Sequence, residues 1–279
     1  MKGGRKKRMN KFSKLFFLSA LLVVFLSASV LAVEPFGANV NNINTTRSPD
    51  NNATSDYAMA GNVTELTVTG VSVTQAWQGY FGNVSGTIQL ADNGDNVMYN
   101  WSLASPEGEI YASTNNSIIW SYIQCLNFDS DADYSDVATG GVPGGMNLHG
   151  TNLAILNSMF GIDAGDRDAP NNTFSMAGTH ESGGGLAHDL FYTNNLDFTA
   201  GECLSTHVFA AGGTPVDSTF QEVLLYEPTT RSVVFTSLLD EENPLGFDAK
   251  AHDFEMLVLE NGHLTDTATT TYYFWVELQ

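Results

Sequence analysis

The sequence predicts an all-β fold, an antiparallel, jelly-roll-like β-sandwich with long loops and at most one or two short helices. Three observations predict this class. Apolar and polar residues alternate with period two in two blocks of the chain, as they do in half-buried strands. Turn sequences rich in Asn, Gly and Pro separate these runs at roughly 10-residue spacing. Apolar residues make up 43% of the chain and aromatic residues 11%, which is enough to build a core.

The first block of predicted strands begins at Asn62. In its opening run, 62–73, Leu and Val alternate with Thr, and the phase changes after Gly70, which indicates a bulge or a bend. The next two runs face each other across an Asn-Gly turn, a strong hairpin signal. Four strands are therefore expected to continue an antiparallel meander: 84–90, 97–103, 109–113 and 118–125.

The middle of the chain, 126–202, is less regular and holds Gly-rich and Asp-rich loops. Its best helix candidate is 151–160, with Thr151 as the N-cap. The run 270–278 has apolar residues on both faces, which favours a central strand covered on both sides. The second block contains five predicted strands: 203–209, 220–226, 232–238, 254–259 and 270–278.

The N-terminus is typical of a targeting segment. Seven basic residues precede an uncharged apolar run that ends at Ala32, next to a small-residue cleavage pattern. We predict a signal peptide over 1–32, although the run is also long enough for an uncleaved anchor. A flexible linker or assembly segment is expected over 33–60 and the β-sandwich domain over 61–279. No membrane span is expected after cleavage.

The mature chain is strongly acidic. All 31 acidic residues follow Ala32, and only four basic residues do, which gives a formal charge of −27. Such a surface repels nucleic acid and anionic lipid, so neither is expected as a partner. The charge is compatible with divalent cations or with a solvated anionic coat.

Two kinds of covalent modification are expected in an exported chain. Cys125 and Cys203 are the only cysteines, and they most simply form one disulfide. Seven N-x-S/T sequons predict an N-glycosylated surface. The seven candidate asparagines are Asn44, Asn52, Asn62, Asn83, Asn100, Asn115 and Asn171.

One acidic loop has the pattern of a calcium site. Alternate carboxylates in a loop can converge on one Ca²⁺, which takes six to eight oxygen ligands. The loop is not an EF-hand, because Tyr134 stands where the turn glycine belongs. A solvated acidic loop is the alternative interpretation. The four candidate ligands are Asp129, Asp131, Asp133 and Asp136.

The sequence contains no convincing catalytic set, and we do not predict an enzyme. Glu222 or Glu255 with another acid could hydrolyse glycosidic bonds, but 31 acidic residues make such a pair uninformative. A secreted hydrolase is the third hypothesis. A group of aromatic residues could stack on sugars, although core packing is the favoured interpretation: Trp77, Tyr80 and Phe81.

Residues 75–101 are the most distinctive stretch. They read QAWQGYFGNVSGTIQLADNGDNVMYNW and are followed by SPEGEIYAS and SIIWSYIQC, which ends at Cys125. This stretch, with the preceding AMAGNVTELTV, resembles a block that recurs in exported archaeal surface proteins, some of them associated with filaments or envelope layers. The resemblance implies β-rich surface material and carries over no active-site residue.

Together these features favour an extracellular, non-enzymatic structural protein, a subunit of a cell-surface filament or envelope layer that assembles with copies of itself. The linker over 33–60 could add as a strand to the sheet of a neighbouring subunit. The alternative is a carbohydrate-binding or adhesin module, which would bind cell-surface glycans and use the calcium loop.

Overall fold

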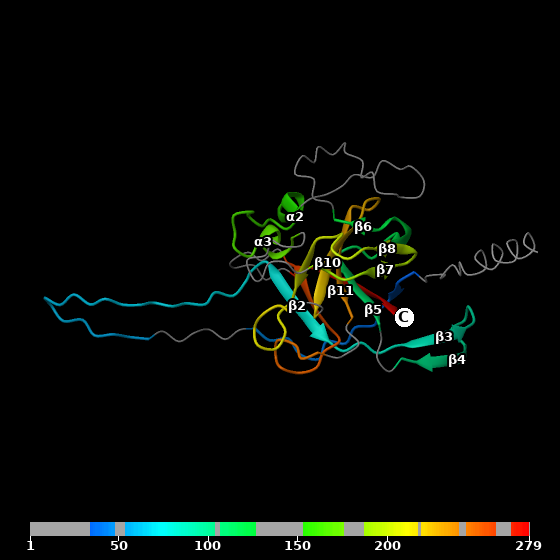
Figure 1. Cartoon of the computed structure of the whole chain (residues 1–279), viewed down its shortest axis with the longest axis horizontal. Helices are drawn as coiled ribbons and strands as arrows, with labels where there is room; N and C mark the ends of the chain where they lie inside the picture. The colour runs from blue at the N-terminus through cyan, green and yellow to red at the C-terminus, as the bar shows by residue number, and fades with distance from the viewer. Residues whose placement is uncertain are drawn as a thin grey trace, which may run out of the picture. The chain divides into compact units, whose positions relative to one another are not determined.

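A seven-stranded antiparallel sheet, sheet A, organises the fold (Figure 1). Its strands lie in the order β1–β13–β5–β11–β10–β6, and β9 also pairs with β10. Their bounds are β1 Phe36–Gly37, β5 Gly108–Ser113, β6 Gln124–Cys125, β9 Ser205–His207, β10 Gln221–Glu227, β11 Ser232–Leu238 and β13 Tyr273–Leu278. The computed structural model describes residues 34–47, 54–103, 107–126, 153–175, 187–216, 219–239, 244–260 and 269–278.

Apolar residues alternate along the central strands so that both faces of sheet A are apolar. On β10, Val223 and Leu225 join one buried cluster, whereas Leu224 and Tyr226 join the other. The same alternation occurs on β11 and β5. Because successive side chains of a strand point to opposite faces, both faces need a covering layer.

The first face of sheet A is covered by a two-stranded ribbon and two short helices. The ribbon pairs β2, Trp77–Gly82, with β12, Phe254–Leu259. Met256 and Val258 of β12 are buried in this cluster, together with Leu153 and Leu156 of the first helix. The helices are α2, Leu153–Met159, and α3, Pro170–Thr173.

The second face is covered by the hairpin β7–β8 and by a 3₁₀ turn, η1. Phe191 and Phe198 stack at 4.7 Å between ring centroids and are buried there. Trp120 of η1 packs against Tyr111, with 4.9 Å between ring centroids. The bounds of these elements are β7 Phe191–Thr193, β8 Leu196–Phe198 and η1 Trp120–Tyr122.

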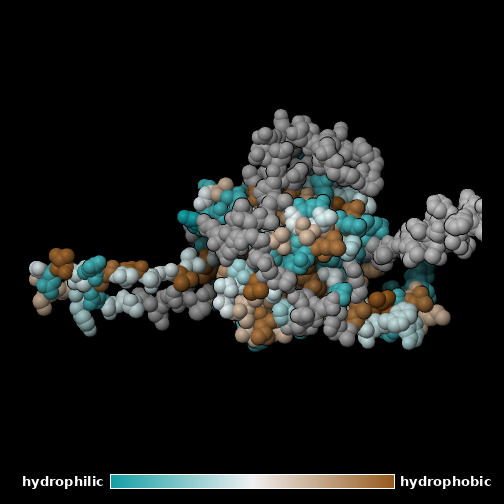
Figure 2. Space-filling model, in the orientation of Figure 1, coloured by the Kyte–Doolittle hydropathy of each residue, from teal (hydrophilic) through white to brown (hydrophobic). Residues whose placement is uncertain are grey.

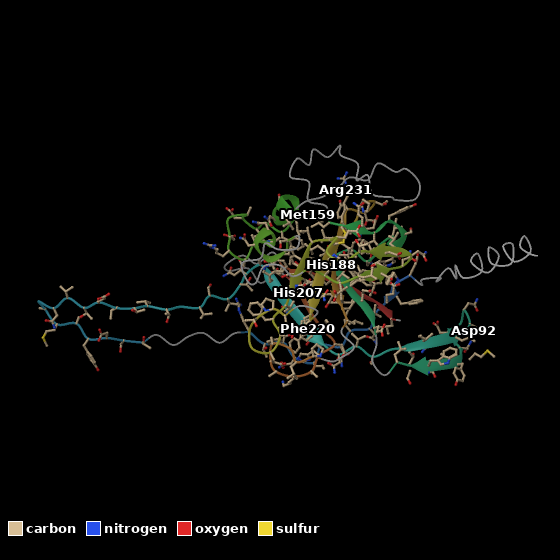
Figure 3. The ribbon with its side chains drawn as sticks, in the orientation of Figure 1. Asp92, Met159, His188, His207, Phe220 and Arg231 are labelled. Carbon is tan, nitrogen blue, oxygen red and sulfur yellow. A yellow bond between two sulfur atoms is a disulfide. The ribbon has the colours of Figure 1, made fainter. Side chains whose placement is uncertain are left out.

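A further hairpin pairs β3, Thr87–Ala91, with β4, Val97–Ser102, and it belongs to neither sheet A nor the β2–β12 ribbon. The carboxylate of Asp92 (labelled in Figure 3) closes its turn by accepting the amide hydrogens of Gly94 and Asn96, each at 2.9 Å. The root of the hairpin is tied by a backbone hydrogen bond from Leu103 to Gly86, 3.2 Å long.

The predicted class, an all-β antiparallel sandwich with long loops and at most two short helices, is confirmed. The Asn-Gly hairpin, the β10–β11 hairpin, the strand at 254–259 and the helix within 151–160 all form close to their expected bounds. Three expectations about individual strands are wrong, and each has a physical cause.

The run 62–73 forms no strand, because no described strand lies beside it. The expected strand 118–125 is reduced to β6, since Tyr122 and Ile123 donate to the carbonyls of Ile119 and Trp120 and close the η1 turn. Strand β13 is covered on both sides, as expected, because Phe274 packs against the cluster on the first face and Trp275 against the cluster on the second. It is not central, however, because only the two-residue β1 separates it from the sheet edge, and Tyr273 is exposed.

The predicted disulfide joins Cys125 to Cys203 across a sequence separation of 78 residues, with 5.0 Å between the Cα atoms. It connects β6 to the segment just before β9 and is part of the second core cluster. In the part of the chain that the structure describes, no helix has the length and apolar character of a membrane span.

We expect the double substitution Cys125→Ser with Cys203→Ser to lower the free energy of unfolding by about 4 kcal/mol, because the cross-link restricts the unfolded chain over a long loop. Urea unfolding followed by Trp fluorescence measures the change. Wild-type protein under reducing conditions is the matched control and should behave like the variant. Equal urea midpoints for oxidised and reduced wild-type protein would contradict the expectation.

Candidate functional site

Glu222 is a buried acid that joins the β2–β12 ribbon to sheet A. Its side chain lies on β10 and is 0% exposed, and its Oε2 accepts the amide hydrogen of Leu257 on β12 at 2.8 Å. Desolvation by burial raises the pKa of Glu222 well above its usual value. The neighbouring carbonyl of Glu255 on β12 accepts a hydrogen bond from Ser237 on β11 at 3.0 Å. Side chains of sheet A therefore form hydrogen bonds with the backbone of β12 along its outer edge, the edge that does not pair with β2.

A second group of buried acids joins the β7–β8 hairpin to the opposite face. Glu109 on β5 and Glu277 on β13 are directly paired in register. Glu109 Oε1 accepts the amide hydrogen of Tyr192 at 3.3 Å, and Glu277 Oε2 accepts that of Asn194 at 3.0 Å. Tyr111 also donates its hydroxyl to Glu277 Oε2, at 3.1 Å. The two carboxylates thus hold the turn of the hairpin.

Proximity and burial change the ionisation of this pair. Desolvation raises the pKa of Glu109 to about 8, and the charge of Glu277 adds to the rise, against the hydrogen bond from Tyr192. Desolvation also raises the pKa of Glu277. The carboxyl group of Glu109 therefore keeps its proton at neutral pH. These acids bind backbone amides, which gives them a structural role.

The two acids that we considered as candidates for glycoside hydrolysis occupy such structural positions. Glu222 binds Leu257, as described, and Glu255 Oε1 accepts the amide hydrogen of Phe247 at 2.9 Å. Gly246 lies directly against this side chain, because a Cβ there would come within 2.2 Å of Glu255 Oε1. Glu255 therefore holds the loop that precedes β12.

His188, labelled in Figure 3, is buried and lies next to Cys203 of the disulfide. Its Nδ1 lies 2.7 Å from the carbonyl oxygen of Asp189, and its Nε2 accepts the amide hydrogen of Cys203 at 2.8 Å. Both ring nitrogens are therefore used by the backbone in the neutral form. Desolvation by burial lowers the pKa of His188, which favours that form.

The predicted calcium loop, with Asp129, Asp131, Asp133 and Asp136, lies outside the described residues. The described residues contain no group of three or more His, Cys, Asp or Glu side chains placed to hold a metal ion. The calcium site thus stays a prediction.

Most predicted glycosylation sites lie at the surface. Asn115 is half-buried, and its Nδ2, the atom that would carry a glycan, donates to Ser232 Oγ at 2.8 Å. A glycan on Asn115 would replace this hydrogen bond. Asn52 lies outside the described residues. The exposed candidates are Asn44, Asn62, Asn83, Asn100 and Asn171.

The aromatic residues considered for sugar stacking take part in packing instead. Trp77 Nε1 donates to the carbonyl of Asp168 at 2.6 Å, and Tyr80 meets Phe274 edge-on with 5.3 Å between ring centroids. Phe81 is half-exposed and meets the ring of Phe247 edge-on at 4.9 Å. Core packing was the favoured interpretation, and the contacts of Trp77 and Tyr80 agree with it, whereas Phe81 packs at the surface.

The β3–β4 hairpin has an uncovered apolar face. Ile88 pairs with Trp101 and Leu90 with Tyr99, so the four side chains share one face. All four are exposed, Trp101 at 50% and Tyr99 at 60%, and the hydrophobic residues of this hairpin are visible in Figure 2. The opposite face carries polar residues, among them the sequon Asn100. This amphipathic pattern predicts a buried face, and the described chain leaves that face exposed.

Residues 62–73 form a second uncovered feature. The Leu and Val side chains up to Val71 are exposed, Val68 at 86%, whereas Val73 is half-buried. Figure 1 draws this segment, in cyan, as an extended trace without strand arrows. The segment leads directly into β2, whose outer edge also has no strand partner in the described part of the chain. The alternation of 62–73 is evident in the sequence, whereas the missing strand partner is evident only in the described structure.

Comparisons with protein-family models, with curated proteins and with solved structures each find no match to the chain.

The buried acids predict a pH dependence of stability. Between the usual Glu pKa of 4.5 and the folded value of about 8, folded Glu109 holds a proton that the unfolded chain has lost. The free energy of unfolding should therefore fall as the pH rises through this window and level off above it. For Glu109 alone the fall is at most about 5 kcal/mol.

The substitution Glu109→Gln removes this contribution and keeps an oxygen acceptor for Tyr192. Urea unfolding at pH 5 and at pH 9 measures the change. The difference in the free energy of unfolding between the two pH values should be smaller for the variant than for wild-type protein. Glu107→Gln is the matched control, because this exposed residue lies two positions away. If the difference between pH 5 and pH 9 in the free energy of unfolding is the same for Glu109→Gln and wild-type protein, Glu109 is not the source of the pH dependence.

Proposed function

We propose that the chain is a non-enzymatic subunit of an extracellular assembly, a cell-surface filament or an envelope layer. The uncovered apolar face of the β3–β4 hairpin carries this proposal. A two-stranded hairpin is marginally stable in water without a further strand or a packed layer. A contiguous exposed apolar face of this kind is typical of a protein–protein contact.

The charge distribution supports contact between copies at the same place. Residues 66–91 contain no charged side chain, and neither do residues 96–106. The mature chain carries a formal charge of −27, so two copies repel each other over most of their surface. The uncharged run includes both β2 and β3, and it is where copies approach at the least electrostatic cost.

Export is supported by covalent features. The Cys125–Cys203 disulfide is compatible with an oxidising, extracellular environment. The predicted signal peptide over 1–32 and the sequons agree with secretion, and the mature chain would then carry glycans on exposed asparagines. The glycan of Asn100 would stand on the polar face of the hairpin and leave the apolar face free.

A carbohydrate-binding module is the second candidate function. Tyr99 and Trp101 lie side by side on the exposed face, with 4.8 Å between ring centroids, and adjacent aromatic rings can stack on sugars. In this case the purified protein would remain monomeric and would bind cell-surface glycans. The predicted calcium loop would make that binding calcium-dependent.

Negative-stain microscopy and light scattering of the purified mature chain test the two candidates. We expect polymers from wild-type protein and a single-copy mass from Leu90→Asp, because the substitution places a charge on the apolar face. Gln89→Asp introduces the same charge on the polar face and should still polymerise. Wild-type protein that stays monomeric at every concentration and binds a glycan array would overturn the assembly function.

A further inference from the structure

We propose that residues 63–73 of one copy add as a β-strand to the open edge of the β3–β4 hairpin of a second copy. The inference rests on the proposed assembly function and names the two surfaces that meet. We call residues 63–73 the donor segment. The occupant of the hairpin edge is thus a segment of this same chain, supplied by another molecule.

The donor segment has the pattern of a strand but no partner. Leu66 and Val68 alternate with Thr, and a bulge at Gly70 would bring Val71 and Val73 onto the same side. Leu66, Val68 and Val71 are all exposed. Val, Leu and Thr fit a pleated, half-buried surface, and their extended backbone presents a row of amide and carbonyl groups.

The β3–β4 hairpin, in turn, has edges without a strand partner in the described structure. β3 and β4 pair with each other, and neither has a second strand partner among the described residues. A third strand would pair the free backbone amide and carbonyl groups of the open edge. It would also bring the sheet to three strands, the number that a stable small sheet needs. Cross-strand pairs of aromatic and β-branched residues are favourable, so Val68 and Val71 suit Tyr99 and Trp101.

Strand β1 makes the donor segment a better candidate than the earlier part of the linker. Phe36 and Gly37 pair with Val276 and Trp275 of β13 in the same chain. The linker over 33–60, which we considered as a donated strand, is therefore partly engaged within its own copy. The donor segment has no such engagement in the described structure.

The position of β2 argues against pairing within one copy. The donor segment precedes the first residue of β2, Trp77, whereas the hairpin follows its last residue, Gly82. At about 3.3 Å per residue, six residues of β2 separate the two by roughly 17–20 Å. To reach its own hairpin the chain would have to turn at 74–76 and fold back along the six residues of β2, which would use up residues 68–73.

The same arrangement specifies the type of assembly. A donor at one end of β2 and an acceptor at the other end form a heterologous, head-to-tail contact. Such contacts produce open polymers unless the rotation happens to close a ring. Both segments are almost uncharged, with Glu65 the one charged side chain in the donor segment. Polymer growth would therefore bring few acidic side chains together.

A complementation experiment tests this contact with the full mature chain. The donor variant is Leu66→Asp with Val68→Asp, and the acceptor variant is Leu90→Asp with Tyr99→Asp. Each variant alone should show the mass of one copy by light scattering. A 1:1 mixture should show the mass of two copies and stop there, because one intact donor and one intact acceptor remain.

The matched control is Thr67→Asp with Thr69→Asp, which adds the same charge to the other side of the donor segment and should polymerise like wild-type protein. Thermal unfolding of each variant verifies that the core remains folded, since all the substituted residues are exposed. A mixture that stays monomeric, or a donor variant that polymerises normally, would overturn the inference. In the second case the assembly function stands, whereas monomeric wild-type protein would overturn that function as well.

Discussion

Hydrogen bonds from backbone amides to buried carboxylates join the covering layers to sheet A. Glu222 holds β12 on one face, and Glu109 with Glu277 holds the turn of the β7–β8 hairpin on the other. A buried acid is costly unless it is hydrogen-bonded, so each of these bonds matters to the position of its layer. Sheet A, which has two apolar faces, thereby becomes the middle of the fold.

The same bonds explain why some strand edges are available and others are not. The outer edge of β12 receives partners from Glu222 and Ser237, and that edge is protected without another strand. In the described residues, neither the outer edge of β2 nor the outer edges of the β3–β4 hairpin have a strand partner. Natural proteins usually cover or charge such edges to prevent unwanted pairing. An uncharged, uncovered edge in a chain this acidic supports the proposed contact between copies.

The sequence predicted the elements whose signals are local. The Asp92–Asp95 turn and the β10–β11 hairpin have turn residues between alternating runs, and both formed as expected. The short strands β7 and β8 were missed, although Asn194, with φ of 56°, sits in the left-handed region that turn asparagines favour. The roles of Glu109 and Glu222 could not be predicted, because which acid becomes buried depends on partners far away in the sequence.

The protonated carboxyl of Glu109 also has a consequence for calorimetry. At neutral pH the unfolded chain carries this group ionised, whereas the folded chain carries it neutral. Folding therefore withdraws protons from the buffer, and unfolding returns them. The heat of unfolding at pH 7 should then include the ionisation enthalpy of whichever buffer is used. Buffers with large and small ionisation enthalpies would give different apparent enthalpies for the same transition, and the slope between them counts the protons exchanged.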